Sequence, residues 1–110
     1  MNIQIQVVND KLAGTIRQRI RRRIVKLTRF NDRLIRAEVK LKKDNNNKLK
    51  GYHCEIRLMI KGNDLFARSK ADNFENATIS VVESLRRQLM KLKVKTVKQR
   101  RKKETIFRGA

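Results

Sequence analysis

The order of apolar and polar residues predicts a strand and then a helix in the first third of the chain. Residues 2–8 alternate between apolar and polar side chains, as in a strand with one buried face. Apolar residues then recur at steps of three or four, namely Leu12, Ile16, Ile20, Ile24, Leu27 and Phe30. This spacing places them on one stripe of a helix, which we expect to be capped by Asn9 or Asp10 and to end near Phe30.

The same alternation returns three times in the middle of the chain and predicts three more strands. The inward-facing members are Ile35, Ala37, Val39 and Leu41 in the first, Tyr52, Cys54, Ile56, Leu58 and Ile60 in the second, and Leu65, Ala67 and Ser69 in the third. A polar loop begins at Asp44 and separates the first two of these strands. A Gly62-Asn63 turn suits a tight hairpin between the last two.

A second helix follows, and its apolar stripe completes the predicted fold. Asp72 or Asn73 can cap it, with Glu75 three residues after Asp72 as in a capping box. The stripe consists of Phe74, Thr78, Val81, Leu85, Leu89 and Leu92. The element order is β-α-β-β-β-α, so we expect an α+β fold with two helices packed on one face of a four-stranded sheet.

Length and composition indicate one domain in a reducing compartment. A chain of 110 residues can bury one modest core. We assign residues 1–98 to this domain and expect residues 99–110 to be a flexible basic tail, because the apolar stripe fades beyond about Lys95. Cys54 has no second cysteine to pair with, and the sequence shows neither a signal-peptide segment nor a membrane-spanning run. We therefore expect a cytoplasmic protein.

Positive charge is concentrated on the two predicted helices. The chain has 30 Lys and Arg against 10 Asp and Glu. Residues 11–33 carry nine basic side chains and one acid, and residues 84–103 carry ten and none. Like charges three or four apart weaken a helix by roughly 0.2–0.5 kcal/mol per pair, so a polyanion would relieve the crowding. The alternative is a basic face that is simply exposed to solvent and keeps the protein soluble. Solubility alone would be served better by a mixture of positive and negative charges. We favour nucleic-acid binding.

The candidate contacts lie on the outward faces of these helices. They are Arg22, Lys26 and Arg29 in the first helix and Arg86, Arg87, Lys91, Lys93, Lys95 and Lys98 in the second. Aromatic side chains are few, which favours recognition of the phosphate backbone and of shape over the reading of bases. A helix-turn-helix would need a third helix, so we predict structured RNA as the partner.

Three segments resemble one known family. Residues 25–34 (VKLTRFNDRL), 65–69 (LFARS) and 85–93 (LRRQLMKLK) are similar to motifs of the ribosome hibernation promoting factor and ribosome-associated inhibitor A family. The resemblance covers about residues 1–98 and is to the short form of these proteins. Two positions depart from the family: Asn73-Phe74-Glu75 replaces a D-x-Y motif, and Ser84 replaces a frequently basic residue.

The resemblance implies a bacterial factor that docks on rRNA and proteins of the small ribosomal subunit, in the decoding channel between head and body. It would block tRNA and mRNA binding, inhibit translation and protect idle ribosomes when growth slows. Arg87 and Lys91 match rRNA-contacting basic positions of the family in the second helix, and Lys26 and Arg29 match basic positions in the first. The free protein would be a monomer. Dependence on a separate ribosome modulation factor stays open.

Other functions find less support in the sequence. A general structured-RNA-binding module or RNA chaperone is the main alternative, although a double-stranded RNA domain of α-β-β-β-α order lacks the first strand. A basic protein on an anionic membrane surface is a third hypothesis. His53 has no catalytic or metal-binding companions, so we expect no enzyme, no metal and no cofactor. An apolar strip of Met90, Val94 and Val97 opposite the stripe suggests a protein contact.

Overall fold

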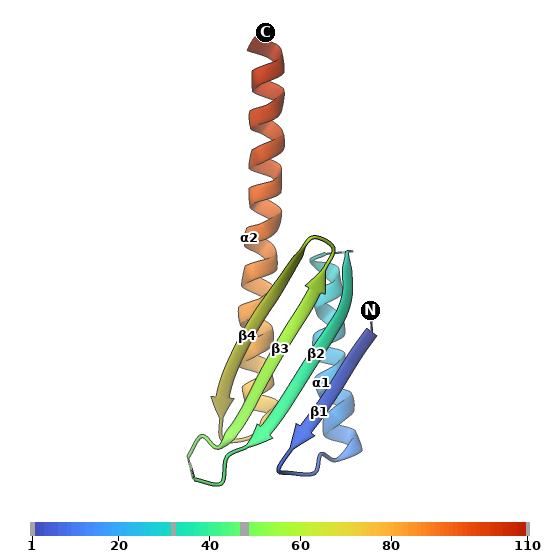
Figure 1. Ribbon diagram of the computed structural model, residues 1–110, viewed down its shortest axis with the longest axis vertical. Coiled ribbons are helices and arrows are strands. Elements are labelled where there is room, and N and C mark those ends of the chain that lie inside the picture. Colours follow the sequence, from blue (N-terminus) through green and yellow to red (C-terminus); the bar gives the residue numbers. More distant parts are fainter. Residues whose placement is uncertain (1, 32, 47–48, 110) are drawn as a thin grey trace.

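The protein is an open four-stranded sheet with two helices on one face (Figure 1). The computed structural model describes residues 2–31, 33–46 and 49–109, with side chains as far as Leu92. The elements are β1 (Asn2–Val8), α1 (Gly14–Val25), the 3₁₀ turn η1 (Lys26–Arg29), β2 (Leu34–Lys43), β3 (Tyr52–Ile60), β4 (Asn63–Ala71) and α2 (Phe74–Gly109). The strands lie in sequence order, with β1 parallel to β2 and the other pairs antiparallel. The predicted fold class is confirmed.

The core lies between the sheet and the two helical stripes. Both helices and the sheet contribute side chains with almost no exposed surface. They are Ile20, Ile24 and Leu27 of α1 and η1, Val81, Leu85 and Leu89 of α2, and Leu41, Ile56 and Leu58 of the sheet. Thr78 is the one buried polar residue among the described side chains, and its hydroxyl donates to the Phe74 carbonyl at 2.8 Å. Each helix buries the apolar stripe that the sequence predicts, and both stripes pack against the same face of the sheet.

The first helix is shorter than predicted at both ends. Asn9 adopts a left-handed conformation (φ 63°), which asparagine tolerates better than most residues, and this turn delays the helix to Gly14. Ala13 is the cap and offers no side-chain hydrogen bond, so the predicted caps were wrong. Lys11 therefore lies in the loop before α1. At the other end the helix tightens into η1, where the Thr28 hydroxyl donates to the Val25 carbonyl at 2.7 Å.

Two details of the strands also differ from prediction. The register between β2 and β3 shifts between Leu34 and Arg36, so Leu34 points inward while Ile35 is 59% exposed. Such a bulge adds one residue and resets the alternation, which a strict period of two cannot foresee. The last hairpin turns at Lys61 and Gly62, because Ile60 already faces Asn63, and Gly62 takes the positive φ of 90°.

The second helix is capped as predicted but extends further. The Asn73 side-chain oxygen accepts the backbone N–H of Asn76 at 2.7 Å. Glu75 does not complete a capping box and instead pairs with Arg19 of α1 at 3.1 Å. The backbone is helical through Gly109, where a flexible tail was predicted from residue 99. Lys, Arg, Gln and Glu favour helix, and no proline interrupts them. The domain boundary at residue 98 stays a prediction.

Candidate nucleic-acid interface

The outward surfaces of α1, η1 and α2 hold the predicted basic residues. Arg22, Arg87 and Lys91 lie opposite the buried stripe of their helix, about 200 degrees around the axis from a core neighbour, whereas Arg86 flanks the stripe, about 60 degrees from Leu89. Arg22, Lys26, Arg29, Arg87 and Lys91 are exposed, and Arg86 is partly exposed. We call these six residues the basic helix face. The ion pair between Arg19 and Glu75 links the two helices beside it.

The 3₁₀ turn aligns two members of the basic helix face. Residues three apart point the same way in a 3₁₀ helix, so Lys26 and Arg29 project in one direction. Leu27 is buried between them and fixes the turn to the core. The prediction of an α-helix to Phe30 placed these two side chains about 60 degrees apart, because three residues of an α-helix turn through about 300 degrees. The structure brings the two side chains into line.

Most cations of this face have no acidic neighbour. In the part of the chain with described side chains, Arg22, Lys26, Arg29 and Lys91 take part in no ion pair. Two other arginines of α1 serve the fold instead. Arg19 pairs with Glu75, and Arg17 donates to the Ile5 carbonyl of β1 at 3.5 Å. Unpaired surface cations at close spacing repel one another, so phosphate groups would lower the free energy of this face.

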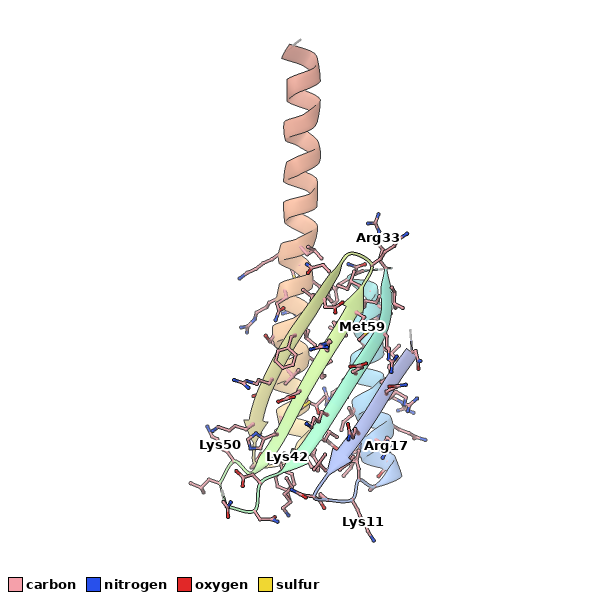
Figure 2. The ribbon with its side chains drawn as sticks, in the orientation of Figure 1. Lys11, Arg17, Arg33, Lys42, Lys50 and Met59 are labelled. Carbon is pink, nitrogen blue, oxygen red and sulfur yellow. The ribbon has the colours of Figure 1, made fainter. Side chains whose placement is uncertain are left out.

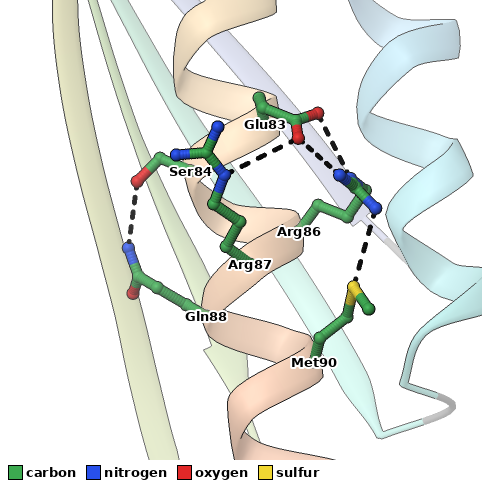
Figure 3. Close-up of polar contacts among 6 residues, drawn as sticks. All are labelled: Glu83, Ser84, Arg86, Arg87, Gln88 and Met90. Atoms are coloured by element: carbon green, nitrogen blue, oxygen red, sulfur yellow. Dashed lines mark hydrogen bonds and ion pairs between the residues drawn. The ribbon is translucent and has the colours of Figure 1, made fainter.

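Glu83 modifies the face, and the sequence analysis missed it. Its carboxylate accepts two hydrogen bonds from the Arg86 guanidinium, at 3.2 Å and 2.5 Å, and lies 3.7 Å from Nε of Arg87 (Figure 3). The hydrogen bonds from Arg86 lower the pKa of Glu83, and Glu83 raises the pKa of Arg86. The i, i+3 and i, i+4 spacing of acid and arginine was the signal that could have found it.

The side chains around Glu83 divide toward the two neighbours of α2. Arg86 and Met90 point toward the side of α1, and Arg86 Nη1 lies 3.6 Å from the Met90 sulfur (Figure 3). Ser84 and Gln88 point toward β4 (Figure 3). Gln88 donates to the Phe66 carbonyl of that strand at 3.1 Å. Arg87 lies between these two groups. Met90 is 47% exposed, while Val94 and Val97 of the predicted strip lie outside the described side chains.

Three predicted contacts cannot be placed in detail. Lys93, Lys95 and Lys98 lie on the helical backbone of α2, but their side chains are outside the described residues. The backbone at these positions continues along the same helix axis that carries Arg87 and Lys91 (Figure 1). Their contribution to a nucleic-acid contact stays a prediction.

Residues with other potential chemistry lie elsewhere. Cys54 is fully buried, and burial raises the pKa of its thiol to about 11, as expected for an inert core residue. His53 lies on the sheet face away from the helices, with Asp44 at 4.0 Å. Across the described residues, His, Cys, Asp and Glu nowhere gather in threes that suit a metal ion. No helix in the same part of the chain is both long and apolar enough to cross a membrane.

Comparison with known proteins decides the family. The model of the family described as Sigma 54 modulation protein / S30EA ribosomal protein matches residues 3–97. This chain belongs to that family. A member from Acinetobacter guillouiae, named ribosome hibernation promoting factor, is 31% identical over 97 residues, which span 83% of this chain and 86% of the relative. The family resemblance found in the sequence is therefore confirmed. The family is not enzymatic, which also confirms the expectation that the chain is no enzyme.

Two solved structures share the fold of this family member. The N-terminal domain of Protein Y from Thermus thermophilus superposes with a TM-score of 0.72 at 22% identity, covering 84% of this chain and 99% of the other. A ribosomal subunit interface protein from Coxiella burnetii gives 0.75 at 18% identity, with coverages of 86% and 99%. At such identities the likeness shows the fold alone, a four-stranded sheet with two helices on one face.

Proposed function

We propose that this protein is a ribosome hibernation factor that binds rRNA of the small ribosomal subunit through the basic helix face. Bound in the decoding channel, it would exclude tRNA and mRNA by its bulk, inhibit translation and protect idle ribosomes. Membership of the S30EA family and the relative named ribosome hibernation promoting factor support this function. The observation that carries the mechanism is the set of exposed, unpaired cations on two adjacent helices, opposite the core.

The chemistry of this face suits a folded RNA more than a base sequence. Its members are Lys and Arg side chains, which bind phosphate oxygens, and the described part of the face includes no aromatic ring. The helical backbone of α2 is about 54 Å long, enough to follow several phosphates along an RNA groove. Recognition would come from the spacing of the two helices, which the sheet holds fixed.

Further features of the proposal follow from the ribosome as partner. The protein would act in the bacterial cytoplasm, would be a monomer when free and would contact ribosomal proteins as well as rRNA. Lys93, Lys95 and Lys98 would extend the contact along α2. A ribosome modulation factor is a further candidate partner, and the Met90 side of α2 is a candidate protein contact.

Charge reversal tests the proposal. The double variant Arg87→Glu and Lys91→Glu replaces two exposed cations of α2 that have no core contacts. Each lost phosphate contact should reduce the slope of log affinity against log salt by about 0.7–0.9. We expect weaker co-sedimentation with small subunits and, in parallel, relief of translation inhibition in a cell-free system.

A matched control separates this face from total charge. Lys11 and Lys61 are exposed, lie in loops outside both helices and can be reversed to Glu with the same change in net charge. This control should retain most of the binding. If the control loses affinity as strongly as the α2 variant, or if the α2 variant binds and inhibits like the unchanged protein, the basic helix face is not the contact surface.

The alternative of a general RNA-binding module makes a different prediction. Such a module would bind duplex RNA about as tightly as intact small subunits, whereas a hibernation factor should prefer the subunits. The described structure also contains β1, which pairs in parallel with β2 and has no counterpart in an α-β-β-β-α domain. No observation favours the general module over the proposed function.

A further inference from the structure

The face of the sheet that the helices leave uncovered carries a regular array of polar and charged side chains. Figure 1 shows the strands in front and both helices behind, and Figure 2 shows Met59 and Lys42 on this open side. The strand register arranges the open side in cross-strand rows. The two central rows are Gln4, Glu38, Arg57 and Phe66, and Gln6, Lys40, Glu55 and Arg68.

Phe66 is the unusual member of this array. It is 47% exposed, although an aromatic side chain of this size normally contributes to a core. Its strand partner on β3 is Arg57. The backbone beneath it is fixed, because Gln88 of α2 donates to its carbonyl at 3.1 Å. The ring is thus held on the open side of the edge strand β4, opposite Arg57 of β3.

A shallow depression of about 620 Å³ lies next to the ring. Its polar lining offers hydrogen-bonding groups of three kinds: the amides of Gln4 and Gln6, the carboxylates of Glu38 and Glu55, and the cations of Lys40 and Arg57. Amides and carboxylates pair with the edges of nucleobases, and cations pair with phosphates. An aromatic face next to such groups matches an unpaired nucleotide, whose base stacks and whose edge is free.

The charge of the open face also favours an anionic partner. Its outward positions include six basic residues, Arg36, Lys40, Lys42, Arg57, Arg68 and Lys70, against three acids, Glu38, Glu55 and Asp64. Arg36 already pairs with Glu38 at 3.5 Å along the same strand. If each of the three acids neutralises one basic residue, three cations of the open face remain without a matching acid.

We propose that the open sheet face is a second RNA-binding surface, which takes a short unpaired stretch of RNA. One base stacks on Phe66, its edge meets the amides and carboxylates of the depression, and the adjoining phosphates lie on Arg57, Lys40 and Arg68. The surface lies on the opposite side of the molecule from the basic helix face. The protein can therefore hold a structured RNA on one side and a single strand on the other.

A site-resolved titration tests this surface. The chain of 13.0 kDa suits amide NMR, and the Arg87→Glu, Lys91→Glu background suppresses binding by the helices. Addition of short oligo(U) should shift amide signals of residues 55–57 and 65–68. Phe66→Ala and Phe66→Leu should each weaken this interaction by about tenfold, while Phe66→Trp should preserve it. Spectra of the free variants report whether each remains folded.

Two controls make the result decisive. Ile35→Ala removes another exposed apolar side chain of the sheet, at the β2 bulge, and should leave oligo(U) binding unchanged. A sugar–phosphate chain that lacks bases carries the same charge and should bind the sheet face much more weakly. Shifts confined to α1 and α2, equal binding of the abasic chain, or full affinity of Phe66→Ala would each overturn the proposal and leave a merely solvated sheet.

The two surfaces can fail separately. Phe66→Ala in the otherwise unchanged chain should retain small-subunit binding through the helices, because no member of the basic helix face is altered. Loss of oligo(U) binding with intact co-sedimentation therefore supports the second surface alone. Intact co-sedimentation of the Arg87→Glu, Lys91→Glu variant would instead contradict the proposed function and leave the sheet surface standing.

Discussion

Glu83 is the residue whose position most directly affects how the basic helix face meets RNA. Its carboxylate engages Arg86 through two hydrogen bonds and approaches Arg87, so two of the six cations are partly neutralised before any partner arrives. A phosphate that binds these arginines must compete with the carboxylate and also meets its negative charge. On the proposed function, Glu83 would therefore moderate the affinity for RNA and orient the two guanidinium groups at the same time.

Replacement of Glu83 by glutamine frees Arg86 and Arg87 and should raise affinity for the small subunit. The rise should be only about twofold to fivefold, because an exposed ion pair of this kind is weak. The measurement is equilibrium binding at several salt concentrations. Asp64→Asn is the matched control, since Asp64 is exposed, lies at the start of β4 and changes net charge equally. An equal rise in both variants would point to total charge and not to the local pair.

Cys54 gives a prediction about stability against pH. Burial raises the pKa of its thiol from an ordinary value of 9.0 to about 11, so the folded state favours the protonated form. Its contribution is fully present below pH 9.0 and is lost as pH rises toward 11, because the unfolded chain releases the proton first. Between these limits the unchanged protein should lose roughly 2 kcal/mol more than Cys54→Ala in urea unfolding. Parallel curves for the two proteins would refute the assignment.

At the scale of elements, the sequence predicts those features that depend on a repeated period. The stripe of α2 from Phe74 to Leu92 and the strand β3 from Tyr52 to Ile60 needed only a regular alternation, and both lie where predicted. The bulge at Ile35 and the 3₁₀ turn at Lys26 do not repeat, so a period could not reveal them.

In the candidate site, too, the sequence predicts what depends on a repeated period and misses what depends on tertiary contacts. Charge density and helical phase placed Arg22, Lys26, Arg29, Arg87 and Lys91 outward, and the structure agrees. Two features depended on tertiary structure: Gln88 anchoring β4 and Phe66 exposed on the open side. The alternation of Leu65, Ala67 and Ser69 placed Phe66 on the other side of its strand, but only the complete layer arrangement shows that no helix covers that side.

The start of α2 gives a direct test at this scale. Asn73→Ala removes the side-chain oxygen that accepts the Asn76 N–H, and should lower the free energy of unfolding by about 1 kcal/mol. Asn73→Asp should preserve it, because aspartate caps helices equally well. Chemical unfolding measures both. If Asp72→Ala costs more than Asn73→Ala, the capping residue is misassigned, since Asp72 contacts only the Asn76 side-chain amide.

The whole molecule is an elongated body with two different faces. Its extents are 63 × 25 × 17 Å, and the last part of α2 projects past the sheet (Figure 1). The sheet fixes the distance between the helices, so on the proposed function the basic helix face would act as one rigid surface for folded RNA. The open side lies opposite, with the exposed Phe66 on its edge strand β4. Such an arrangement suits a protein that fills a narrow channel lined by RNA.

A reconstruction of the protein bound to the small ribosomal subunit tests the central claim most directly. The account predicts α1, η1 and α2 against rRNA in the channel between head and body, with Arg22, Lys26, Arg29, Arg87 and Lys91 near phosphate groups. The tRNA and mRNA paths would be occupied by the body of the domain. A complex in which the helices face solvent, or in which the protein lies outside the decoding channel, would contradict it.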